Sequence, residues 1–193
     1  MVFSSFQVLL AVLLLMCFAS FAWAVRNFFV KPEQRTVGLK ITLLFGSLFA
    51  LLHLLTILYT VVLPVPAVIA ALLYCLGLVI FWWTVTANRL KPLAACFSPN
   101  EQLHLVQHGP YRFVRHPFYC SYLLVWLAGS VGTLNLLLGL TCAVMFVLYL
   151  IAARKEESKF AASPLADHYA LYRRTTGGFL PSPLKLIANR RVR

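Results

Sequence analysis

Three long stretches of the chain carry no charged side chain, and they determine the architecture that the sequence predicts. These stretches are residues 2–25, 41–88 and 117–153, with histidine counted as neutral. About 20 apolar residues cross the roughly 30 Å hydrocarbon core of a membrane as a helix. The first stretch therefore predicts one uncleaved membrane helix, Val2–Val25, whereas each of the other two is too long for a single crossing.

Turn-forming residues divide the second stretch and the third. Pro64-Val65-Pro66 interrupts the second one, because proline does not continue a helix. The pattern there predicts two helices, Lys40–Leu63 and Ala67–Ala87. Gly132 and Asn135 mark a turn in the third stretch, where glycine and asparagine are typical.

The third stretch therefore predicts a helical hairpin. Its first arm, Pro117–Val131, is short, and its second arm is Leu134–Ala153. The predicted fold class is an all-α integral membrane protein with about five transmembrane helices. The number becomes four if the short arm only dips into the membrane. We treat residues 1–193 as a single membrane domain.

Composition and charge placement support this prediction and orient it. Only 11% of the residues are charged and 61% are hydrophobic, whereas soluble domains carry about 25% charged residues. This excludes a soluble globule, a disordered chain and a coiled coil. All 17 Lys and Arg residues fall in 26–40, in 88–116 or after 153, which the predicted helices place on one side.

By the positive-inside rule, the N-terminus lies outside and the C-terminus in the cytoplasm. The net charge of +12 is then explained by topology and by contact with anionic lipid headgroups. No nucleic-acid partner is expected. The outer face has no acid and no histidine, so any reaction centre should face the cytoplasm. The five cysteines form no CxxC pair, and no metal site is predicted.

One histidine stands apart from this face. His53 lies in the second predicted helix, between pairs of leucines. An ionisable residue inside a membrane is by default a candidate functional site. The alternative is a neutral histidine that hydrogen-bonds to a neighbouring helix.

The densest polar segment precedes and begins the fourth predicted helix. It contains Gly109-Pro110-Tyr111 and Arg115-His116-Pro117, followed by Tyr119. A helix that begins at Pro117 presents free amides and partial positive charge to an anionic group. The alternative is a basic loop at the membrane surface. Glu156-Glu157 forms the acidic counterpart after the fifth helix, where a solvated helix end is the simpler interpretation.

These segments together resemble the isoprenylcysteine carboxyl methyltransferase family, which is related to the membrane phospholipid methyltransferases. The first segment matches the pattern G-x-Y-x-x-x-R-H-P-x-Y, and Glu156-Glu157 matches the acidic pair that ends the last helix. Tyr169-x-x-Tyr172, then Thr176-Gly177 and Pro181, resembles the tail of that family. The resemblance covers about residues 88–181, which it implies to be the cofactor-binding and catalytic region.

The resemblance implies an enzyme that transfers a methyl group from S-adenosylmethionine to a lipophilic acceptor at the cytoplasmic face. It implies these cofactor-binding residues: Leu103, His104, Leu105, Val106, Gly109, Tyr111, His116, Pro117, Phe118, Tyr119, Glu156 and Glu157. The catalytic candidates are His116, Arg115 and Arg154. Arg115 either anchors to headgroups or pairs with one of the two glutamates. Tyr169 and Tyr172 share one helical face and are expected to dock the tail.

The methyl acceptor stays open at this point. The family often carries an arginine where this chain has Ala152, and the nearest one is Arg154. This difference favours a lipid, an isoprenoid or another hydrophobic small molecule over a prenylated protein. Leu103 also stands where the family has a histidine, with His104 one residue later. Two other classes are considered: a sterol or lipid reductase and a non-catalytic membrane protein.

Overall fold

The computed structural model describes residues 3–28, 37–89 and 104–182. Within these ranges the chain is helical and contains no strand. Its elements are α1 (Ser5–Asn27), α2 (Val37–Tyr59), α3 (Pro64–Ala87), the short 3-10 helix η1 (Gly109–Arg112), α4 (Pro117–Thr133), α5 (Leu136–Ala161) and α6 (Ala166–Thr175).

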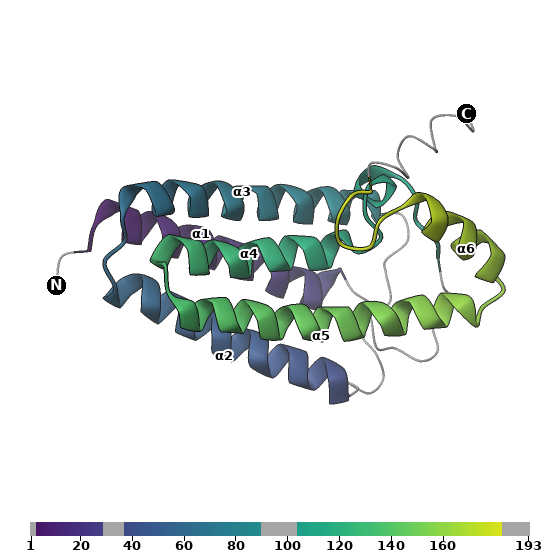
Figure 1. The fold of residues 1–193 in the computed structure, drawn as a ribbon, viewed down its shortest axis with the longest axis horizontal. Coiled ribbons are helices and arrows are strands. Elements are labelled where there is room, and N and C mark those ends of the chain that lie inside the picture. Colours follow the sequence, from purple (N-terminus) through teal and green to yellow (C-terminus); the bar gives the residue numbers. More distant parts are fainter. Residues whose placement is uncertain (1–2, 29–36, 90–103, 183–193) are drawn as a thin grey trace.

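The first five α-helices form an elongated bundle in which consecutive helices run in opposite directions (Figure 1). The elements η1 and α6 lie together at one end of this bundle, opposite the start of α1. The bundle and its five helices confirm the predicted all-α fold. Because α1, α3 and α5 all run toward the end that carries η1 and α6, the described basic residues gather there.

Four of the helices are long and apolar enough to cross a membrane: α1, α2, α3 and α5. The fourth helix, α4, has 17 residues and at 1.5 Å per residue is about 25 Å long. It lies along α3 rather than across the end of the bundle (Figure 1). A Cβ at Gly77 of α3 would lie 3.1 Å from Val125 of α4, so a small residue permits this close packing, as in other membrane helix pairs.

The predicted helix ends differ from the observed ones most at the break between α2 and α3 and at the end of α5. Helix α2 ends at Tyr59, and α3 begins at Pro64 rather than at Ala67. Proline is tolerated in the first helical turn because the amides there have no helical acceptor. Helix α5 continues from the predicted end, Ala153, to Ala161. The charged residues after Ala153 end the apolar segment but not the helix, because Lys, Arg and Glu are good helix formers.

The turn between α4 and α5 lies where the sequence predicts it. Leu134 adopts a left-handed backbone conformation with φ of 50°, and the Asn135 side chain accepts a hydrogen bond from the Leu137 amide at 2.9 Å. This side chain caps the start of α5. The turn reverses the chain, so the start of α4 and the end of α5 meet at the same end of the bundle.

Candidate active site

The Arg-His-Pro motif lies between η1 and α4, where the C-terminal segment holds its backbone. Pro117 is buried and begins α4. The Arg115 amide donates to the Gly177 carbonyl at 2.8 Å, and the His116 amide donates to the Gly178 carbonyl at 3.2 Å. Because α5 ends at the same end of the bundle, these contacts bring the motif next to Glu156 and Glu157.

Glu157 is the centre of a cluster of cationic groups. Its Oε1 accepts hydrogen bonds from Arg115 Nε at 3.0 Å and Arg115 Nη2 at 2.9 Å. His116 Nε2 lies 3.1 Å from the same oxygen, and Arg173 Nε of α6 lies 3.7 Å from Oε2. Arg115 also donates to the Thr176 carbonyl. Of the two alternatives for Arg115, the structure shows the pairing with a glutamate.

Glu156 faces the other side of His116. The Tyr119 hydroxyl donates to Glu156 Oε1 at 2.6 Å, and His116 Nδ1 lies 3.4 Å from Oε2. Burial alone would lower the pKa of His116, but hydrogen bonds and charge from Glu156 and Glu157 outweigh burial. The pKa of His116 is therefore raised above its usual value of 6.5. The imidazole joins two carboxylates and favours its protonated form.

Aromatic rings line the side of this cluster that faces the bundle. Tyr119 stacks on Tyr149 of α5 with centroids 5.3 Å apart and on His116 at 5.7 Å. Phe179 lies 5.6 Å from His116 and 5.8 Å from Phe146. The ring faces of this wall can attract a cation beside the carboxylates.

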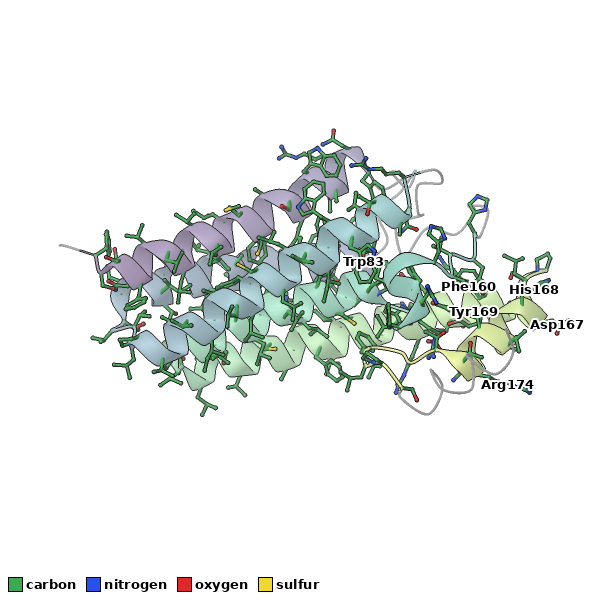
Figure 2. All side chains as sticks on the ribbon, turned by 90° about the horizontal axis from the view of Figure 1, so that it is seen from above. Trp83, Phe160, Asp167, His168, Tyr169 and Arg174 are labelled. Carbon is green, nitrogen blue, oxygen red and sulfur yellow. The ribbon has the colours of Figure 1, made fainter. Side chains whose placement is uncertain are left out.

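An open cavity of about 840 Å³ adjoins the cluster on the side of α6. Its lining includes Arg115, Glu157, Tyr169 and Arg173. Figure 2 shows Tyr169 and Phe160 at the end where α6 lies, and their rings stack at 4.8 Å. A volume of this size is typical of small-molecule sites.

Comparison with known families identifies the class of protein to which the chain belongs. The family model of phospholipid methyltransferases matches residues 65–167, which is more than half of the chain. The chain belongs to the phospholipid methyltransferase family. This family includes the isoprenylcysteine carboxyl methyltransferases, so the resemblance in the sequence is confirmed. No curated protein matches the chain.

The family and the apolar helices together identify an integral membrane methyltransferase. The match begins in α3 and ends at Asp167 in the first turn of α6. It therefore contains the Arg-His-Pro motif and both glutamates. The tail segment 176–179, which holds the motif, lies beyond it.

Several predicted site residues make contacts within the fold, and their contact with a cofactor stays a prediction. Tyr111 is buried, and its hydroxyl accepts from Asn88 Nδ2 at 3.1 Å while its carbonyl accepts from the Tyr172 hydroxyl at 2.7 Å. Phe118 packs against Phe81 in the bundle core. Gly109 has φ of +60°, a conformation that glycine adopts without strain. These contacts hold the motif against the bundle.

The remaining predicted residues are half-buried, exposed or outside the described ranges. His104, Leu105 and Val106 are half-buried, and Leu103 lies outside the described residues. Arg154 is exposed on α5. The described part of the chain holds no group of three or more His, Cys, Asp or Glu residues suited to a metal ion. The predicted docking of the tail by Tyr169 and Tyr172 agrees with the burial of both side chains.

Sequence reasoning missed part of this site. Four residues that contact the motif, its glutamate partner or its aromatic neighbours were not predicted as site residues: Phe179, Tyr149, Thr176 and Arg173. Tyr149 lies seven residues before Glu156, about two helical turns, so it falls on the same face of α5. That spacing is the one signal in the sequence that identifies it. The contacts of the tail depend on how the chain folds back in three dimensions, which the spacing of residues in the sequence does not predict.

Proposed function

We propose that this membrane methyltransferase takes its methyl group from S-adenosylmethionine and transfers it to a lipophilic acceptor at the cytoplasmic face of the membrane. The observation that supports this most is that the two glutamates have different hydrogen-bond partners. Glu157 accepts hydrogen bonds from Arg115 and lies beside His116, whereas Glu156 is engaged by Tyr119 and keeps its side chain 29% exposed.

The donor set fits the cofactor chemically. S-adenosylmethionine offers ribose hydroxyls and an ammonium that hydrogen-bond to a carboxylate, and a carboxylate has about four lone-pair positions. Glu156 therefore retains acceptor capacity beside the tyrosine hydroxyl. The rings of Tyr119, Tyr149 and Phe179 provide aromatic faces suited to a sulfonium cation, at about 0.5–2 kcal/mol for each contact. When bound, the cofactor supplies an electrophilic methyl group, and the protein supplies positioning.

The position of the site supports a lipophilic acceptor. The cluster lies at the end of a bundle whose outer faces carry exposed large hydrophobic residues on α1, α2, α3 and α5. A lipid in the same leaflet reaches this end laterally. Ala152 is buried and offers no guanidinium for an acceptor carboxylate. We therefore favour a lipid, an isoprenoid or another hydrophobic small molecule over a prenylated protein.

Cofactor binding tests this proposal directly. Titration of purified protein in detergent with S-adenosylmethionine should give saturable binding. Glu156→Gln keeps the size and removes the charge, and loss of a charged hydrogen bond costs about 1.5–3 kcal/mol. We therefore expect affinity to fall by about 10- to 150-fold.

Ser158→Ala provides the matched control, because Ser158 is exposed two residues further along α5. Its affinity should equal that of the wild type. A folded Glu156→Gln protein with unchanged affinity would refute the assignment of the cofactor to this carboxylate.

A further inference from the structure

Two buried polar atoms in the middle of the bundle lack a partner among the described residues. His53 of α2 and Tyr74 of α3 are both 0% exposed. Neither His53 Nδ1 nor the Tyr74 hydroxyl makes a hydrogen bond within the described part of the chain. Inside a membrane no bulk water satisfies such groups, so unpaired ones are strongly unfavourable. A polar group bound between the two atoms would therefore stabilise both.

The hydrogen bonds around His53 determine what each atom needs. His53 Nε2 lies 2.9 Å from Thr141 Oγ1, and Thr141 Oγ1 donates to the Leu138 carbonyl at 2.8 Å. A threonine hydroxyl has one proton, so Thr141 accepts from His53, and we assign the ring proton to Nε2. His53 Nδ1 is then a pure acceptor, while the Tyr74 hydroxyl has a proton to donate.

Gly129 of α4 brings the two atoms close to each other. Both His53 Nδ1 and the Tyr74 hydroxyl oxygen lie within 3.1 Å of the point where a Cβ would begin at Gly129. One oxygen between them can therefore reach both, because a hydrogen bond joins heavy atoms about 2.7–3.2 Å apart. An alanine side chain would overlap the His53 ring.

We propose that His53 and Tyr74 form a binding site for one hydroxyl group inside the helix bundle. The O–H of that hydroxyl donates a hydrogen bond to His53 Nδ1, and its oxygen accepts a hydrogen bond from the Tyr74 hydroxyl. A buried water molecule and a hydroxyl-bearing lipophilic molecule both offer this chemistry. The site is independent of the proposed methyl transfer.

Trp126 connects this hydroxyl site with the stacked rings of Tyr149 and Tyr119. Its ring lies edge-on to His53 with centroids 5.1 Å apart, and its Nε1 donates to the Tyr149 hydroxyl at 3.2 Å. Tyr149 in turn stacks on Tyr119, which contacts Glu156. His53 is thus linked to Glu156 through packed rings, and Trp126 and Tyr149 belong to the buried core of the bundle.

Solid-state NMR of ¹⁵N-histidine-labelled protein tests the proposal. One sample uses phosphatidylcholine bilayers, whose lipids carry no free hydroxyl, and a second adds the isoprenoid alcohol farnesol. We expect His53 Nδ1 to be unprotonated and in contact with water protons in the first sample. Replacement of this contact by alcohol protons in the second would identify a lipid hydroxyl as the preferred occupant, and its persistence would identify water. A contact with the Tyr74 hydroxyl proton alone in both samples, or a protonated Nδ1, would overturn the proposal.

Two pairs of variants make the result specific. Gly129→Ala adds a methyl group that overlaps the His53 ring and should abolish the contact with the third molecule. Gly139→Ala should retain the contact, because its Cβ would meet only Ser130 Oγ at 3.4 Å. If Gly129→Ala does not fold, Tyr74→Phe removes one hydroxyl and should shift the Nδ1 resonance. The exposed Tyr59 provides its control as Tyr59→Phe. An unchanged Nδ1 resonance in Tyr74→Phe would contradict the proposal.

Discussion

Removal of the charge on Glu157 should destabilise the end of the bundle that carries the site. One oxygen of this carboxylate accepts two hydrogen bonds from Arg115 and lies 3.1 Å from His116 Nε2. The side chains of Arg115 and Glu157 are only 11% and 17% exposed. Glu157→Gln therefore leaves a mostly buried guanidinium without its counter-charge.

The structure sets the size of this effect. Removal of one partner from a buried ion pair costs about 3–5 kcal/mol. The lower end applies here, because glutamine keeps a carbonyl oxygen that can accept and the pair is partly exposed. At about 2–4 °C for each kcal/mol in a chain of this size, we expect the melting temperature to fall by about 6–12 °C.

Thermal unfolding of the protein in nanodiscs, followed by circular dichroism, measures this change. Asp167→Asn removes an acid that is exposed in the first turn of α6 and should shift the melting temperature far less. The double variant Arg115→Gln with Glu157→Gln should lose less stability than the sum of the single variants. A melting temperature for Glu157→Gln equal to that of Asp167→Asn would show that the ion cluster does not stabilise the site.

Three further predictions follow from the site and the fold. The pKa of His116 is raised above 6.5 in the folded protein, so the stability that His116 contributes is complete below about pH 6.5 and is lost as pH rises through the higher folded pKa. Thermal unfolding at a series of pH values should show this loss, and the His116→Gln variant should not show it. Gly177→Ala should release the tail, because its Cβ would overlap a backbone carbonyl, whereas Gly178→Ala meets only a side chain at 3.6 Å; limited proteolysis of the tail should separate the two, and equal digestion rates would contradict the close backbone approach at Gly177. Topology reporters fused at Val65 and Arg193 should report opposite sides of the membrane, and matching signals would reject the five-helix arrangement.

The sequence was sufficient to predict the helices because lipid constrains them simply. Every apolar stretch of membrane length must be helical, and turns such as Leu134–Asn135 follow from glycine and asparagine. The ends were less predictable. Proline marked the break between α2 and α3 but joined the first turn of α3, and α5 continued through Glu156 and Glu157.

The sequence identified two segments of the candidate site, one before α4 and one at the end of α5. Arg115, His116 and the glutamates were identified as a motif, and the structure brings them into contact. Tyr111 and Phe118 belong to the same motif and contact Asn88 and Phe81 in the structure, and their contact with a cofactor stays a prediction. A motif shows which residues occur together but does not tell which side of a helix faces the ligand. The contribution of Phe179 depends on how the tail returns over α4, which only the tertiary structure reveals.

Methyl transfer in reconstituted membranes tests the central claim most directly. Purified protein is placed in liposomes of native membrane lipid with S-adenosylmethionine that carries a labelled methyl group, and the lipids are extracted. The wild type should transfer label to a lipophilic species, and Glu156→Gln should transfer at least about tenfold less, as expected for loss of a charged hydrogen bond. Bound cofactor without label in any lipophilic species would contradict a methyltransferase that acts on acceptors in the membrane.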